Sequence, residues 1–169
     1  GTRSDWILFL HDDTQLESGW EYDAKKFMSD VQSGVTDQAA AAFRFQLDDH
    51  GFAPRALETL VNFRTRLFKF PYGDQGLLIS RQLYESVGGY SSISLMEDVD
   101  IIRRLGRKRV VGLRAQALTS ATRFRKHGYA RRILRNQFCL ALYYLNVSPE
   151  RLSRYYLLIY KICMMHLNL

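Results

Sequence analysis

The alternation of apolar and polar positions predicts strands and helices in turn along most of the chain. A run of consecutive apolar residues, Trp6–Leu10, is typical of a strand that is buried on both faces, as in a parallel sheet. Residues 39–47, in which aromatic and polar side chains alternate, form a second candidate strand. Between Arg55 and Phe68 the apolar positions recur at helical spacing, which predicts a helix.

Glycine and proline mark the breaks between the remaining elements. We expect a helix from 20 to about 31, a loop at 71–76, a strand at 77–79, a helix at 81–87 that stops at Gly88-Gly89, a helix at 97–105 and a strand at 109–113. From Gly128 the pattern predicts two helices joined at 146–150, with Pro149 at the first position of the second. Strands that alternate with helices favour an α/β fold, here followed by a helical hairpin.

Composition and charge narrow the class of protein. The chain has 169 residues, of which 47% are hydrophobic and 24% charged, as expected of one globular protein. Its net charge of +7 favours anionic partners. From Arg123 onward the sequence has nine lysines and arginines, interleaved with aromatic residues, and one glutamate. The excess positive charge is therefore concentrated in this tail. Such a tail fits an anionic membrane surface, but equally a helical hairpin with solvated arginines. Nucleic acid is a weaker partner, because no recognition motif accompanies the charge.

The cysteines and the hydropathy pattern indicate a compartment. Cys139 and Cys163 lie in apolar, helix-like segments and match no zinc or redox spacing, which predicts buried free thiols in a reducing compartment. No signal peptide is recognised, and the sequence has no run of apolar residues long enough to require a membrane span. We expect a cytoplasmic protein, at most peripheral at the inner face of the cell membrane.

A first acidic motif, His11-Asp12-Asp13, follows the first expected strand directly. In open α/β sheets, ligands bind beyond the carboxyl ends of strands. Adjacent carboxylates are hard oxygen ligands that suit Mg²⁺ or Mn²⁺ bridging to phosphates, and His11 adds an imidazole. The alternative is an acidic turn that caps the following helix.

Two further motifs carry candidate chemistry. Glu97-Asp98 begins a helix, where carboxylates either stabilise the helix terminus or supply a general base. The loop Gly73-Asp74-Gln75-Gly76 has two glycines, which either let the backbone approach a ligand closely or simply form a tight turn.

The order of these motifs resembles that of family 2 glycosyltransferases. The resemblance rests on Leu8–Thr14 followed by Gly19-Trp20, on the Gly-Asp-Gln-Gly loop, on Glu97-Asp98, and on Arg123-Phe124, where many members have Arg-Trp. It is greatest to the small bacterial branch in which His replaces the first Asp of the Asp-x-Asp motif. It covers about Trp6 to Tyr155 and implies a GT-A-like, partly Rossmann-like mixed sheet flanked by helices.

The resemblance also implies roles for individual residues. Asp13, with His11 and Asp12, would bind Mn²⁺ or Mg²⁺. Asp98 would be the general base, with Glu97 beside it. Asp74, Gln75 and Gly76 would form the wall of the sugar and acceptor pocket, and Arg123 would contact the diphosphate.

The function that follows is an inverting transfer of sugar from a nucleotide-diphosphate donor to a saccharide or lipid-linked acceptor. Residues 1–127 would form the catalytic part, and 128–169 a basic helical extension packed on the same domain. The family's first nucleotide-binding segment is missing from this sequence, which begins without Met close to its first motif, so we expect upstream sequence. The alternative is a non-catalytic module that binds a membrane surface through its basic tail.

Overall fold

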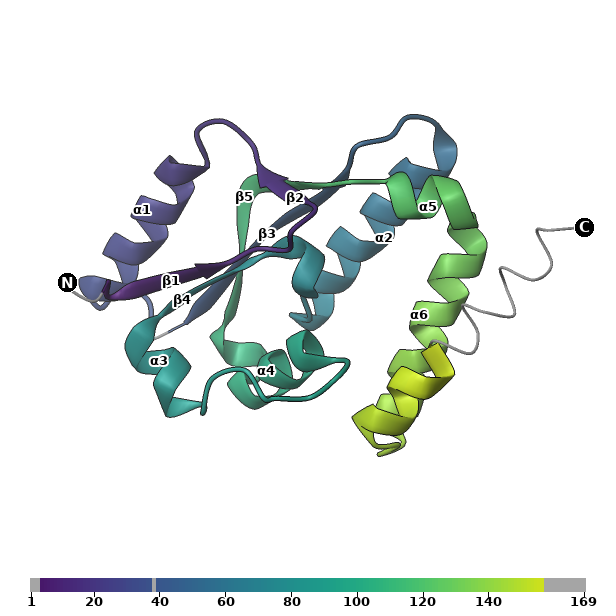
Figure 1. Ribbon diagram of the computed structural model, residues 1–169. Coiled ribbons are helices and arrows are strands. Elements are labelled where there is room, and N and C mark those ends of the chain that lie inside the picture. The colour runs from purple at the N-terminus through teal and green to yellow at the C-terminus, as the bar shows by residue number, and fades with distance from the viewer. Residues whose placement is uncertain (1–3, 38, 157–169) are drawn as a thin grey trace, which may run out of the picture. The chain divides into compact units, whose positions relative to one another are not determined.

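The computed structural model describes residues 4–37 and 39–156 as a mixed α/β fold (Figure 1). Its strands are β1 (Trp6–Phe9), β2 (Thr14–Leu16), β3 (Ala40–Leu47), β4 (Leu77–Ser80) and β5 (Val110–Thr119). Its helices are α1 (Trp20–Gln32), α2 (Phe52–Phe68), α3 (Arg81–Ser86), α4 (Glu97–Leu105), α5 (Thr122–His127) and α6 (Tyr129–Tyr144), with 3-10 turns η1 (Gly73–Gln75) and η2 (Arg107–Arg109). Residues 149–156 are also helical. Each predicted strand and helix is therefore present, whereas β2 and α5 were not predicted.

Contacts divide the chain into two compact units. In the described residues, the first unit comprises 4–90 and 98–121, and the second comprises 91–97 and 122–156. α5 groups with α6 in the second unit, where the rings of Phe124 and Tyr129 stack with centroids 5.1 Å apart. The expected division of the chain at residue 127 stays a prediction. The packing of the helical extension on the α/β part stays a prediction.

The sheet of the first unit is mixed and has the strand order β1-β4-β3-β5-β2. Only β3 and β5 pair in parallel, and the three other pairs are antiparallel. β1 is an edge strand whose one neighbour is β4, with Trp6 opposite Ser80 and Phe9 opposite Leu77. A parallel neighbour for β1, which its apolar run suggested, is therefore wrong, because β1 pairs in the antiparallel direction.

Both faces of the sheet are nonetheless packed, as the apolar run predicted. Trp6 and Leu8 pack on a buried cluster beside α1, whereas Ile7 and Phe9 pack on a cluster beside α3 and α4. The first cluster contains Ala24, Phe27, Phe43, Leu78 and Ala117, and the second contains Leu77, Ile79, Leu83, Ile101 and Leu105. Because side chains alternate along a strand, an edge strand covered on both faces needs apolar residues at consecutive positions.

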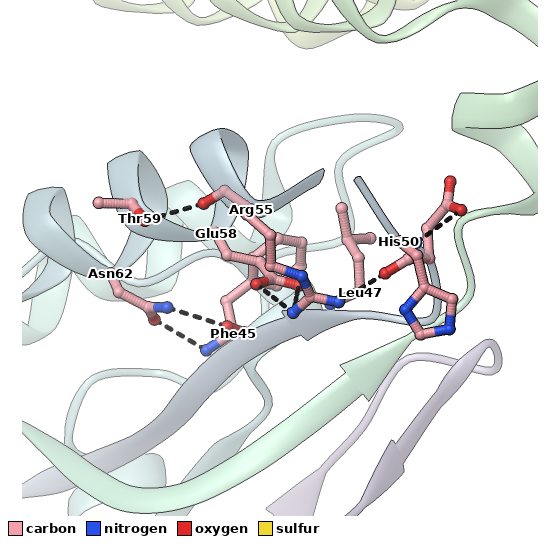
Figure 2. A network of polar contacts seen from close by, with 8 residues as sticks. Phe45, Leu47, His50, Arg55, Glu58, Thr59 and Asn62 are labelled. Carbon is pink, nitrogen blue, oxygen red and sulfur yellow. Dashed lines mark hydrogen bonds and ion pairs between the residues drawn. The ribbon is translucent and has the colours of Figure 1, made fainter. Parts of the chain in front are cut away.

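One edge of β3 is completed by side chains instead of a strand. β4 pairs with β3 only at Ala40 and Ala41, so the later backbone groups on that side need other partners. The Phe45 N–H donates to Asn62 Oδ1, and Asn62 Nδ2 donates to the Phe45 carbonyl, both at 2.9 Å (Figure 2). The Leu47 N–H donates to Glu58 Oε1 at 2.8 Å. α2 thus lies along β3 as a substitute for a strand partner.

The second unit contains a helical hairpin formed by α6 and residues 149–156. Arg135, only 9% exposed, stacks over the Tyr156 ring at 4.2 Å and donates a hydrogen bond to its hydroxyl at 2.9 Å. Cys139 is a buried free thiol, as predicted, and burial raises its pKa. Cys163 lies outside the described residues. In the part of the chain that the structure describes, no helix has the length and apolar character that crossing a membrane requires.

Candidate functional site

Backbone and hydroxyl contacts fix the first acidic motif to the end of β5. The turn closes where the Thr14 N–H donates to the His11 carbonyl at 3.2 Å. The Ser120 N–H donates to the Asp13 carbonyl at 2.9 Å, and the hydroxyls of Thr14 and Thr119 lie 2.9 Å apart. These contacts, together with the β2–β5 pairing, hold the His-Asp-Asp turn in one orientation at the end of the sheet.

The side chains of that turn form one cluster of metal-ligand atoms. One ligand atom from each of His11, Asp12 and Asp13 lies within 4.8 Å of the others. His11 Nδ1 is 4.0 Å from Asp12 Oδ1 and 4.0 Å from Asp13 Oδ1. Donors around one small divalent ion are roughly 3–4 Å apart, so modest rotations would bring the three together. The two carboxylates suit Mn²⁺ or Mg²⁺, and of these two ions Mn²⁺ better tolerates the added imidazole.

The two aspartates of the cluster differ in solvent exposure. The Asp12 side chain is 83% exposed, whereas that of Asp13 is 20% exposed. Asp13 would therefore be the more buried ligand, and Asp12 would reach an ion from the solvent side.

Gly73 brings the two acidic motifs together. A Cβ atom at Gly73 would lie 2.8 Å from His11 Nε2 and 3.3 Å from Asp98 Oδ2. The imidazole of the first motif and the carboxylate of the second therefore approach the same point on the η1 backbone. A side chain at this position would push the His11 ring away, since a Cβ atom does not sit 2.8 Å from another heavy atom.

Asp98 is oriented by two backbone donors. Its Oδ2 accepts from the Gly73 N–H at 2.7 Å, and its Oδ1 accepts from the Val99 N–H at 2.8 Å. Met96, two residues before Asp98, has a φ of 68°, a left-handed conformation that is uncommon for a residue with a side chain. These two donors hold the half-buried Asp98 carboxylate in one orientation, and its role as a general base stays a prediction. Glu97, the first residue of α4, is also half-buried, and its contact with an acceptor stays a prediction.

Gln75 has a structural role that the sequence did not reveal. It is only 1% exposed, its Oε1 accepts from the Thr65 hydroxyl at 2.8 Å, and its Nε2 donates to the Phe43 carbonyl at 3.0 Å. These bonds occupy both ends of the amide. Gln75 therefore fixes the turn that carries Gly73, and a hydrogen bond from it to a sugar would first have to break this network.

The other predicted pocket residues are distributed over both units. Asp74 is half-buried, and its carbonyl accepts from the Thr119 hydroxyl at 3.2 Å, which joins η1 to the end of β5. Gly76 has a φ of 64°, and a Cβ there would lie 2.8 Å from Leu10, so glycine permits the turn to approach the end of β1. Arg123 is exposed on α5 in the second unit, and its contact with a diphosphate stays a prediction.

Sequence reasoning did not single out Gly73 as the meeting point of the two motifs. The available signal was the glycine that opens the Gly-Asp-Gln-Gly loop, because a residue without Cβ often marks a close approach. What that glycine would approach depends on segments more than sixty positions upstream and about twenty-five downstream, which no local pattern encodes.

Comparisons of the chain with protein-family models, with curated proteins and with solved structures found no significant match. The resemblance to family 2 glycosyltransferases therefore stays an expectation from the sequence motifs.

Proposed function

We propose that this chain is the catalytic part of a metal-dependent, inverting glycosyltransferase of GT-A type that uses a nucleotide-diphosphate sugar. The observation that carries the proposal is the convergence of His11 and Asp98 on Gly73 beside the His-Asp-Asp cluster. It places one member of a metal-ligand set and an oriented carboxylate against the same glycine of η1. The mixed α/β sheet, with the acidic turn at the end of a strand, is compatible with the fold.

The residues divide the reaction between them. Asp13, with His11 and Asp12, would hold Mn²⁺ or Mg²⁺, which supplies charge neutralisation for a leaving diphosphate. Asp98 accepts the proton of the acceptor hydroxyl, and that oxygen forms a bond to the anomeric carbon. The bond from the anomeric carbon to the diphosphate oxygen breaks on the opposite face, and its electron pair leaves with the nucleoside diphosphate. Attack from the opposite face inverts the anomeric configuration.

The substrates and the location belong to the same proposal. The donor is a nucleotide sugar, and the acceptor is a saccharide or a lipid-linked saccharide. Asp74 and Gly76 would line the donor and acceptor pocket of the first unit, and the contact of Arg123 with phosphate oxygens stays a prediction from the sequence. The protein would act in the cytoplasm, peripheral to the inner face of the membrane where a lipid-linked acceptor is found.

The test is a thermal-shift titration of the chain with uridine and guanosine diphosphates, each with and without Mn²⁺. A ligand that binds only the native state raises the melting temperature as its concentration exceeds its dissociation constant. We expect a Mn²⁺-dependent rise with one diphosphate, and its loss in Asp13→Ala. Asp37→Ala, which removes an exposed carboxylate before β3, is the control that should keep the rise. No rise at millimolar diphosphate, or an undiminished rise in Asp13→Ala, would contradict the proposal.

A second candidate function is membrane-surface binding by the second unit. α6 exposes Leu134 at 69%, Phe138 at 51% and Leu145, just after the helix, at 73%, close to several arginines. Exposed apolar residues beside cations suit an anionic lipid surface. Co-sedimentation with phosphatidylserine vesicles at low salt should detect binding that Leu134→Asp with Phe138→Asp removes. Absence of wild-type binding would exclude this function.

A further inference from the structure

A second polar site lies in the first unit, on the face of the sheet that carries α3 and α4. Those helices cover the starts of β3 and β5, where Ala40 and Val110 are buried. Farther along the same strands, the face is an open groove of about 1090 Å³ between β5 and α2. None of the groove's lining residues belongs to the His-Asp-Asp cluster, and Asp98 does not line it either.

The floor of the groove repeats one pattern on two neighbouring strands. β3 contributes Arg44 and Gln46, and β5 contributes Arg114 and Gln116, in each case an Arg-x-Gln sequence. Residues two apart on a regular strand share a face, as Arg44 and Gln46 do. The β3–β5 pairing is irregular between Gly112 and Gln116, but Arg114 and Gln116 line the same groove. The strands are parallel, and Arg44 is paired in register with Gln116. A guanidinium on one strand therefore lies next to an amide on the other.

The groove is strongly cationic and its positive charges are uncompensated. Two further cations, Arg66 and Lys69, come from the last turns of α2 and the residue after it. In residues 4–37 and 39–156, no carboxylate forms an ion pair with the side chain of Arg44, Arg66, Lys69 or Arg114. The Arg114 backbone N–H donates to Asp23 Oδ2 at 3.1 Å.

The acid that lines the groove is already engaged. Glu58 accepts from Arg55 at 2.6 Å and from the Leu47 N–H at 2.8 Å, where it completes the edge of β3 (Figure 2). Its charge is thus balanced by Arg55, which leaves the other four cations as net positive charge. Such a concave cationic surface attracts anions and raises their local concentration.

The chemistry of the lining selects among anions. Guanidinium groups form forked, charge-assisted hydrogen bonds with carboxylates, whereas neutral amides suit hydroxyl groups, which both donate and accept. A chain of acidic sugars presents both kinds of group at each unit. Phe63, which is 59% exposed on the groove wall, adds an apolar surface for a sugar ring. Single-stranded nucleic acid is disfavoured, because it needs successive exposed aromatic rings and this wall offers one.

We propose that this groove binds an acidic oligosaccharide, with Arg44 and Arg114 on its carboxylates and Gln46 and Gln116 on its hydroxyls. The volume exceeds what a single sugar needs and matches a short chain. The inference does not depend on the proposed transferase activity, since it needs neither a nucleotide nor a metal.

The experiment is calorimetric titration of the chain with a galacturonate hexamer at low ionic strength, without nucleotide or divalent ion. We expect saturable binding that weakens as salt rises, and at least about tenfold weaker binding in Arg44→Gln with Arg114→Gln, which loses two charge-assisted contacts. The matched control is Arg103→Gln with Arg109→Gln, which removes the same charge from exposed arginines outside the groove and should change affinity by less than about twofold.

Two further ligands and one further variant test whether the groove recognises acidic sugars and not charge alone. A neutral glucose hexamer should not bind measurably, and an oligothymidylate of equal charge should bind more weakly than the galacturonate. Gln46→Ala with Gln116→Ala should weaken the galacturonate while leaving net charge unchanged. Absent wild-type binding, equal loss in the control pair, or oligothymidylate binding as tight as that of the galacturonate would each overturn the proposal. Asp13→Ala should bind the galacturonate normally, so failure of the groove and failure of the transferase proposal are separable.

Discussion

The first unit holds two polar sites that are built in opposite ways. At the acidic site, the turn carrying Asp13 and the carboxylate of Asp98 are held by backbone donors, and Gly73 fixes their separation. In the basic groove, Arg44 and Arg114 stand on rigid strands, but no partner in the described chain restrains their side chains. At the acidic site the turn backbone and the Asp98 carboxylate are both held in place, whereas the groove is ordered only in its backbone.

The difference teaches what each site is suited to do. Chemistry on a bond requires reacting groups at fixed distances, and pre-positioned donors lower its barrier. Binding of a flexible, repeating anion tolerates side chains that adjust to each unit. Gln75 connects the two regions, because it lines the groove while its amide fixes the turn that carries Gly73. Substitutions at the acidic site, at Gln75 and in the groove should therefore have different effects.

The largest effect is expected for Asp98→Asn. The asparagine carbonyl can still accept from the Gly73 N–H, although its amide nitrogen cannot accept from the Val99 N–H. The side chain can no longer take up a proton. Removal of a general base costs about 10²–10⁴-fold in rate. Release of nucleoside diphosphate from the donor, in the presence of saccharide acceptors, should fall by that factor while the diphosphate-induced thermal shift persists.

The control for that variant lies two residues along the same helix. Asp100→Asn loses an ion pair with Arg104 at 2.8 Å but no group of the acidic site, so it should retain turnover. Wild-type turnover in Asp98→Asn, or equal loss in Asp100→Asn, would show that the oriented carboxylate is not the base.

Gly73→Ala should break the convergence itself. The new methyl group would lie 2.8 Å from the His11 ring, and overpacking of this kind costs about 1–3 kcal/mol. We expect a lower free energy of unfolding in urea and loss of the Mn²⁺-dependent thermal shift. Gly112→Ala is the matched control, because a Cβ there meets nothing within 4 Å. If Gly73→Ala were as stable as Gly112→Ala and kept the metal response, the close approach would not be real.

Gln75→Leu should destabilise the connection between the two sites. The change leaves the buried Phe43 carbonyl and the Thr65 hydroxyl without their amide partner, at a cost of about 1–3 kcal/mol. Gln116→Leu, the same change in the groove, should cost less, because within the described chain the side-chain amide of Gln116 makes no hydrogen bond. Urea unfolding of both variants measures the contrast, and equal losses would contradict the structural role of Gln75.

Local pattern predicted most of the elements, and its failures have physical causes. α4 was predicted at its observed bounds, because four apolar residues recur at helical spacing within it. β5 was predicted to end at Leu113 but extends to Thr119, since its second half alternates small alanines with polar residues and has little hydrophobic signal. β2, with three residues, is too short for any period to register.

The candidate site was predictable only as far as its donor types. His11, Asp12 and Asp13 are adjacent in sequence, so their clustering follows from a turn, and the structure confirms that they are close. The burial of Gln75 depends on partners from α2 and β3, and the approach of Asp98 depends on η1. Contacts among segments distant in sequence are decided by tertiary packing, and no periodicity in one segment contains them.

The smallest effect should come from the adaptable side. Arg44→Gln with Arg114→Gln removes two exposed cations that pair with no carboxylate in the described chain, so no stabilising contact is lost. Relief of like-charge repulsion should leave the free energy of unfolding unchanged or raise it by up to about 0.5 kcal/mol at low salt. The gain should vanish at about 1 M salt, where the screening length is only about 3 Å. Urea unfolding at both salt concentrations tests this, with Arg103→Gln and Arg109→Gln as reference.

A loss of unfolding free energy above about 1 kcal/mol would mean that Arg44 and Arg114 are structural. The groove would then be as pre-organised as the acidic site, and the contrast between them would fail.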